Sequence, residues 1–174
     1  MGKFLTVLLL VCAIGGGFLM YYQQVYAYYE DVVPNGETDV QITSLITGAP
    51  EPVAYDAFRG IDATSSPIRY RACFDTSMSH AMLTETYMLD DEAVPLTAPG
   101  WFDCFDAEEI GAAIESGAAL AFMGTENIEY GIDRVVAIHE DGRGWVWDQL
   151  NRCGEIVFDG NPAPEDCPTP PEGY

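Results

Sequence analysis

Positive charge is scarce in this chain of 174 residues. Lys and Arg number 7 against 28 Asp and Glu, so the formal net charge is −21 at pH 7. Lys3 is the single lysine, and the segment after Tyr22 holds six arginines and all 28 acids, a formal charge of −22. A surface of this sign repels phosphate backbones, which excludes nucleic-acid binding. Its natural partners are cations or basic proteins, and the acidity also keeps a domain soluble.

The sequence also lacks the short motifs of common catalytic sites. It has no Walker loop, no G-x-G-x-x-G and no G-x-S-x-G. It has no Cys-x-x-Cys, and its two histidines, His80 and His139, lie far from the cysteines, which argues against zinc. No window fits a calcium loop. We therefore predict no metal and no cofactor, and we favour a protein that is not an enzyme.

What the chain does have is an uncharged apolar run from Phe4 to Tyr22. Its 19 residues would form a helix about 28 Å long, close to the hydrocarbon thickness of a bilayer. The positive flank before it and the acidic flank after it place the N-terminus in the cytoplasm and the rest across the membrane. We expect helix to continue to about Val32. Five tyrosines near its end are typical of an interfacial belt: Tyr21, Tyr22, Tyr26, Tyr28 and Tyr29.

The same region fits a signal peptide cleaved after Ala27, with Val25 and Ala27 as the small pair before the cut. The apolar run is longer than a usual signal-peptide core, and bulky tyrosines follow it. For that reason we favour a retained single-pass anchor.

Four cysteines follow the anchor: Cys73, Cys104, Cys153 and Cys167. An even number on the exported side of a membrane predicts two disulfides. Three pairings are open. We favour Cys73–Cys104 with Cys153–Cys167, because the second bridge would fasten an otherwise loose tail.

The remaining pattern predicts an α+β domain with a largely antiparallel sheet. Residues 39–47 and 118–124 read as strands, and residues 67–75 as a half-buried strand with its arginines on the outer side. Residues 79–89 fit a helix or a strand equally well. The clearest helix spans 106–117, because Asp106 is a good N-cap, Glu109 would complete a capping box and Gly117 would stop the helix.

A hairpin is predicted around Asp141-Gly142, the strongest short turn signal in the chain. A two-residue turn there places Glu140 opposite Arg143 and Ile138 opposite Trp145. We divide the chain into an anchor with a juxtamembrane helix (1–33), an acidic domain (34–158) and a Pro-rich acidic tail (159–174) that should be extended.

Three arginines are the most informative charges, because Arg serves specific bidentate pairing better than general solubility. Arg69, Arg71 and Arg134 could form an anion or partner pocket with Trp101 and Trp145. Internal salt bridges are the ordinary explanation, and we favour it. A pocket that gathered Arg69 or Arg71 with a histidine would favour the functional one.

Four segments together resemble a known family: "MYYQQVYAYYEDVVPNGETDVQ", "SSPIRYRACF", "APGWFDCFDAEEIG" and "ENIEYGIDRVVAIHEDGRGW". They are similar to an uncharacterised family of short, membrane-anchored alphaproteobacterial proteins of the Rhodobacter type. The resemblance covers nearly the whole chain and implies a bacterial inner-membrane protein. Members are sometimes labelled histidine kinases, but this sequence has neither a phosphoacceptor helix nor an ATP-binding motif. The family has no established activity, so the resemblance supplies no catalytic residues.

These observations predict a membrane-anchored accessory or interaction protein with a periplasmic domain. Its partner would be a membrane protein complex or a basic periplasmic protein, attracted by charge. The alternative is a periplasmic enzyme or small-anion-binding domain that uses the Arg/aromatic pocket.

Overall fold

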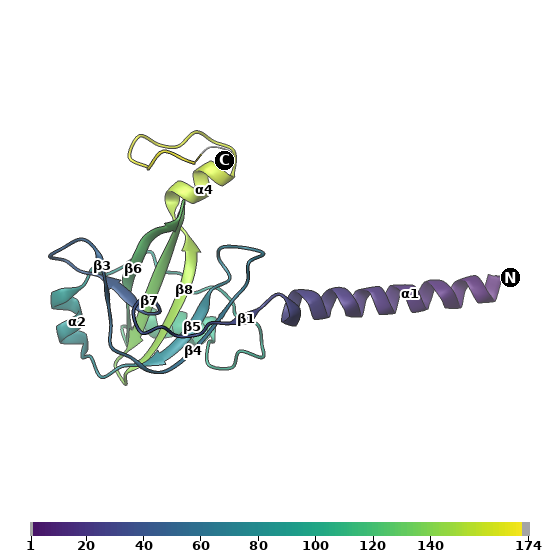
Figure 1. The fold of residues 1–174 in the computed structure, drawn as a ribbon, viewed down its shortest axis with the longest axis horizontal. Coiled ribbons are helices and arrows are strands. Elements are labelled where there is room, and N and C mark those ends of the chain that lie inside the picture. Colours follow the sequence, from purple (N-terminus) through teal and green to yellow (C-terminus); the bar gives the residue numbers. More distant parts are fainter. Residues whose placement is uncertain (1, 172–174) are drawn as a thin grey trace.

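A long helix leads the chain and projects away from the rest of the protein (Figure 1). The computed structural model describes residues 2–171, in which helix α1 (Gly2–Tyr22) continues into a π-helical turn, η1 (Gln23–Ala27). No residue of α1 is buried. The stretch Gly2–Ala27 is long and apolar enough to cross a membrane. An apolar helix that its own protein leaves uncovered suits a lipid environment.

The helix ends earlier than the sequence suggested. η1 stops at Ala27, whereas helix was expected to about Val32. The chain leaves the helix because β1 (Glu30–Asp31) pairs antiparallel with β4 (Asp56–Asp62). Val32 continues this pairing, since its N–H donates to the carbonyl of Gly60 at 2.8 Å.

Six strands form one sheet in the order β1-β4-β5-β8-β7-β6, and all neighbours are antiparallel. β2 and β3 form a second, two-stranded sheet. With three short helices this is an α+β domain, as predicted. The remaining elements are β2 (Gln41–Thr43), β3 (Pro50–Pro52), β5 (Arg71–Asp75), α2 (His80–Thr86), α3 (Ala107–Ser116), β6 (Ala119–Glu129), β7 (Ile132–His139), β8 (Arg143–Leu150) and α4 (Arg152–Phe158).

Hydrophobic side chains fill both faces of the large sheet. On one face Val136 and Val146 belong to a core that includes Leu83 of α2. On the other face Val135 and Trp147 pack in a core with Ile110 of α3. Consecutive residues of β7 and β8 therefore serve opposite cores, as the two-residue period of a strand requires.

β5 is buried on both faces, so the prediction that residues 67–75 form a half-buried strand is wrong. Arg71, which was expected to face solvent, is only 4% exposed, and Cys73 on the same side of the strand is 8% exposed. β5 lies between β4 and β8 inside the sheet, and the loop of residues 96–105 covers its second face. Residues 67–70 precede the strand as a turn and irregular chain.

The other strand predictions hold in part. Of residues 39–47 only Gln41–Thr43 form a strand, and the strand predicted at 118–124 extends through β6 to Glu129. The ambiguous segment 79–89 contains both structures, since α2 is followed by isolated bridges at Tyr87 and Leu89.

The helix predicted at 106–117 is confirmed. Asp106 accepts hydrogen bonds from the N–H groups of Glu108 and Glu109, and Gly117 ends the helix at φ 78°. Only one half of the expected capping box, the hydrogen bond from Glu109 N to Asp106, is formed among the described residues. The carboxylate of Glu109 binds Arg143 at 2.9 Å instead.

The hairpin is present, but its register differs from the prediction by one residue. Ile138 pairs with Gly144, and Trp145 pairs with Ala137. The turn has three residues, because Gly142 adopts φ 96° and its N–H donates to His139 O at 2.9 Å. This shift places Ile138 and Trp145 in opposite cores.

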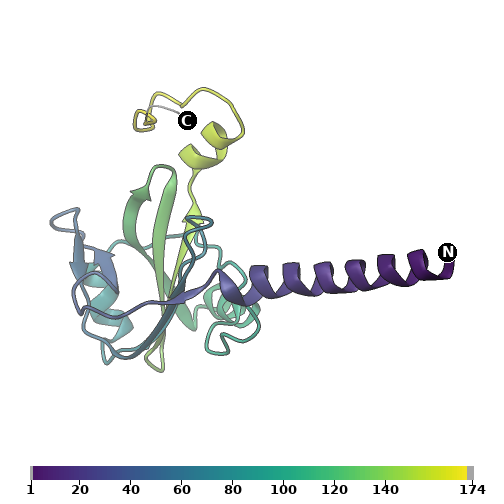
Figure 2. The same cartoon turned by 45° about the vertical axis from the view of Figure 1, so that its right-hand side comes forward.

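Two disulfides join Cys73 to Cys104 and Cys153 to Cys167, the pairing favoured from the sequence. The first links β5 to the loop before α3. The second links α4 to the tail, in which residues 161–171 contain no helix or strand. α4 and the tail sit at one end of the large sheet (Figure 2). Two disulfides are typical of an oxidising compartment.

Candidate functional site

Trp101 fastens the end of the long helix to the domain. Its indole Nε1 donates a 2.7 Å hydrogen bond to the carbonyl of Val25 in η1. The ring of Tyr26 stacks on Trp101 with centroids 6.1 Å apart, and Tyr29 meets it edge-on at 5.9 Å. The last carbonyls of a helix lack partners within the helix, and Trp101 supplies one. We call the contact between Val25, Tyr26, Tyr29 and Trp101 the anchor joint.

A cavity of about 460 Å³ opens beside the anchor joint. We call it the joint pocket. One wall comes from η1, and the others come from residues 66–71 and from the loop between α2 and α3. None of its lining residues is acidic: they are Gln24, Val25, Tyr29, Ser66, Ile68, Arg69, Arg71, Leu96, Thr97, Ala98 and Pro99.

Arg71 is buried in one wall of the joint pocket, and its side-chain hydrogen bonds within residues 2–171 all go to backbone carbonyls. Its guanidinium donates to the carbonyls of Ile68, Tyr70 and Leu96 at 2.6–2.9 Å and to Thr97 O at 3.3 Å. Burial lowers the pKa of Arg71, but an arginine keeps its charge over the physiological range. Arg71 therefore shapes the 96–105 loop and leaves a positive charge beside the pocket.

Arg69 lies half-buried next to it. Its guanidinium carbon is 5.6 Å from the ring centroid of Tyr29. Within residues 2–171, Arg69 and Arg71 are the two arginines that form no ion pair with a carboxylate. The other four do: Arg59 with Asp103, Arg134 with Asp148, Arg143 with Asp141 and Glu109, and Arg152 with Asp166.

The other nominated residues do not all converge on this pocket. Trp101 lies at the joint. Arg134 binds both carboxylate oxygens of Asp148, at 2.7 and 3.0 Å, and stacks on Tyr70. Trp145 is buried in the core and donates to Cys104 O at 3.1 Å.

The histidines are also elsewhere. His80 Nε2 lies 2.8 Å from Ile138 O, and His139 lies 2.9 Å from Asp141. Neither lines the joint pocket, so the arrangement that would favour an arginine–histidine site is not formed there.

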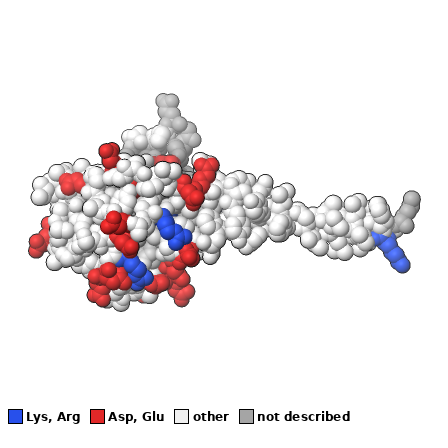
Figure 3. All heavy atoms as spheres, turned by 60° about the horizontal axis from the view of Figure 1, so that its bottom comes forward, with Lys and Arg blue, Asp and Glu red and all other residues white. Residues whose placement is uncertain are grey.

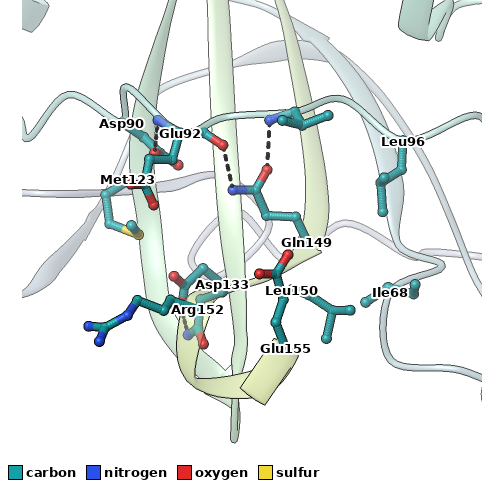
Figure 4. Close-up of a pocket in the computed structure, with 12 residues that line it drawn as sticks. Ile68, Asp90, Glu92, Leu96, Met123, Asp133, Gln149, Leu150, Arg152 and Glu155 are labelled. Carbon is teal, nitrogen blue, oxygen red and sulfur yellow. Dashed lines mark hydrogen bonds between the residues drawn. The ribbon is translucent and has the colours of Figure 1, made fainter. Parts of the chain in front are cut away.

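A second cavity of about 460 Å³ lies near α4 and is acidic (Figure 4). We call it the sheet-end pocket. Asp90 and Glu92 lie on one side of it, across from Asp133 and Glu155. The side chain of Gln149 braces the 90–94 loop, since it accepts from Val94 N at 2.9 Å and donates to Glu92 O at 3.4 Å.

Asp90 has an unusual position in the sheet-end pocket. Its Oδ1 accepts from Glu92 N at 3.0 Å, whereas its Oδ2 is buried without a hydrogen-bond partner among the described residues. Burial raises the pKa of Asp90. No group of three potential metal ligands occurs within residues 2–171.

Sequence reasoning missed three of these features. Tyr29 was assigned to a membrane belt, although it packs on the domain. Asp90 was given no role, because acids are too abundant here for one to stand out. Gln149 carried no signal, since its role depends on a loop more than fifty residues away in the chain.

Comparison with known proteins identifies a family but no activity. No curated protein and no solved structure matches this chain. Residues 40–168, which include both disulfides and every strand of the two sheets except β1, match a family of unknown function (DUF6446). Because the match covers well over half of the sequence, the chain belongs to the DUF6446 family.

Proposed function

We propose that this protein is a noncatalytic accessory protein of a bacterial inner membrane. A single span anchors it with the N-terminus in the cytoplasm. The acidic domain lies in the periplasm and contacts a membrane protein complex or a basic periplasmic protein. The protein would then act by holding a binding surface at a fixed height above the bilayer.

The anchor joint is the observation that carries this proposal. Trp101 bonds to η1, and β1 pairs with β4 only three residues after η1 ends. The span therefore enters the domain through packed and hydrogen-bonded contacts rather than through a long flexible linker. A domain held in this way presents a constant face to a neighbour in the membrane.

Charge supports the choice of partner. Figure 3 shows a long helix without charge along most of its length and acidic residues spread over the domain. A formal charge of −22 beyond Tyr22 would accelerate encounters with a cationic partner, and salt would slow them. The sheet-end pocket combines carboxylates with apolar groups such as Met123 and Leu150, a surface that suits a Lys or Arg side chain.

Topology is tested by thiol labelling of full-length protein in spheroplasts. We expect a membrane-impermeant thiol reagent to label the domain cysteines only after reduction. Domain cysteines that react without reductant, or that become reactive only after the inner membrane is opened, would contradict the periplasmic assignment.

The partner is tested by affinity purification of the intact protein from detergent-solubilised membranes, followed by mass spectrometry. A cationic partner should be recovered at low salt and lost at high salt. A matched variant, Glu92→Gln with Glu155→Gln, should recover less of it, whereas Glu37→Gln with Glu165→Gln, outside the pocket, should not change recovery. Recovery that neither salt nor the pocket variant alters would refute the electrostatic contact.

A further inference from the structure

We propose that the joint pocket binds the phosphate group of a bilayer lipid headgroup, with Arg69 as the contacting cation. The inference rests on the proposed membrane anchorage. It goes beyond that proposal because it assigns a ligand to a site that faces the lipid rather than a protein partner.

Charge isolates this pocket from the rest of the surface. The segment after Tyr22 carries 28 acids against six arginines, so most of its surface repels an anion. Acidic residues line the sheet-end pocket and the cavity beside Arg134. The joint pocket has no acidic lining residue and contains both arginines that lack a carboxylate partner within residues 2–171.

The two arginines have different tasks. Arg71 uses four of its five N–H groups on carbonyls, so its main contribution to the pocket is charge. Within residues 2–171 the Arg69 side chain donates no hydrogen bond, and its guanidinium carbon lies 5.6 Å from the ring centroid of Tyr29, which leaves the N–H edge of the guanidinium for a ligand. That edge matches two phosphate oxygens. The hydroxyl of Ser66 lines the same cavity and can add a donor.

The position of the pocket selects a lipid over a soluble anion. Gln24 and Val25 form one wall, directly after the apolar run that ends at Tyr22. A helix whose apolar part spans the hydrocarbon core places the next residues at headgroup depth, where lipid phosphates lie. The apolar lining residues Ile68 and Leu96 suit the glycerol and upper acyl chain of the same molecule.

The experiment is native mass spectrometry of the full-length protein in detergent with three added probes. The first is a short-chain phosphatidylglycerol. The second is the diacylglycerol with the same chains, which lacks the phosphate. The third is glycerol phosphate, which lacks the chains. We expect the first probe to bind at least about tenfold more tightly than either of the others, because only it satisfies both parts of the pocket.

Arg69→Gln should weaken binding of the phospholipid by about tenfold, the loss typical of one charge-assisted contact. Arg59→Gln is the matched control. The guanidinium carbon of Arg59 also lies near an aromatic ring, 5.5 Å from the ring centroid of Phe102, but Arg59 is already paired with Asp103. It should change lipid binding less than twofold, and thermal unfolding of both variants should show that the domain remains folded.

Three results would overturn the proposal. Equal binding of diacylglycerol would mean that the pocket takes acyl chains alone. Equal binding of glycerol phosphate would mean that the ligand is a soluble anion. An unchanged affinity in Arg69→Gln would place the lipid elsewhere. None of these depends on a protein partner, so failure here is distinct from failure of the affinity purification.

Discussion

Removal of the Trp101 side chain should release the anchor joint. Trp101→Ala deletes the 2.7 Å hydrogen bond to Val25 and the ring contacts with Tyr26 and Tyr29. A neutral hydrogen bond contributes about 1 kcal/mol and an aromatic pair about 0.5–1.5 kcal/mol. The joint should therefore lose about 2–4 kcal/mol of its local stability, which raises the open population roughly 30- to 700-fold. Trp101→Phe keeps a ring and should lose about 1 kcal/mol.

Amide hydrogen exchange of the full-length protein in detergent measures this opening. Peptides covering residues 23–33 should exchange faster in the order wild type, Trp101→Phe, Trp101→Ala, while peptides from β7 and β8 stay protected. Tyr26→Phe is the control, because its hydroxyl makes no hydrogen bond among the described residues and the stacking contact remains. Unchanged exchange of residues 23–33 in Trp101→Ala would refute the idea that Trp101 closes the joint.

Three further predictions concern stability. Ionised Asp90 is desolvated by folding, and this raises its pKa. Because solvent screens this half-buried group, Asp90→Asn should stabilise the protein by less than about 1 kcal/mol at pH 7 in urea unfolding, a gain that disappears below about pH 4. Replacement of Cys73 and Cys104 by Ser opens a bridge with a sequence separation of 31, and it should cost about 4 kcal/mol under oxidising conditions and nothing in excess reductant. Burial raises the pKa of Asp39, but the hydrogen bonds from Tyr55 and from backbone amides outweigh burial and leave the pKa below its ordinary value. Tyr55→Phe removes a 2.6 Å hydrogen bond to Asp39 and should lower the free energy of unfolding by about 1.5 kcal/mol at pH 7. This loss should shrink as Asp39 is protonated in acid.

The sequence predicted those elements whose capping or turn residues lie within a few positions of one another. α3 could be placed because Asp106 and Gly117 satisfy the ends of the helix from within a few residues. The hairpin could be placed because Asp141-Gly142 is a strong turn signal. Its register could not, since a two-residue and a three-residue turn fit the same letters, and only the backbone of Gly142 decides between them.

Features that depend on distant segments were not predictable. Alternation indicated that one side of residues 67–75 faces solvent, because an arginine normally does. Arg71 is nevertheless buried, since four carbonyls from two loops receive its N–H groups. α4 was missed as well, although Asn151 caps it by accepting from Gly154 N, because its seven residues are too few for a periodic pattern.

The candidate site was predicted only as a set of residue types. Scarcity of positive charge identified Arg69 and Arg71, and the structure brings them together with Tyr29. Arg134 and Trp145 belong to the residue types nominated for the pocket but lie in other parts of the fold. Arg134 is held there by an ion pair, and Trp145 by its contacts in the core. Which arginine is already paired is a property of the tertiary structure and leaves no mark in the sequence.

The bridge between Cys73 and Cys104 gives the loop of Trp101 a mechanical role. Trp101 grips η1, and Cys104, three residues later, is covalently tied to β5, an interior strand of the sheet. A sideways force on the span is thus transmitted to the middle of the sheet and does not act on the edge strand β1 alone. Reduction of this one disulfide would make the attachment between the span and the domain more flexible while the span stays in the membrane.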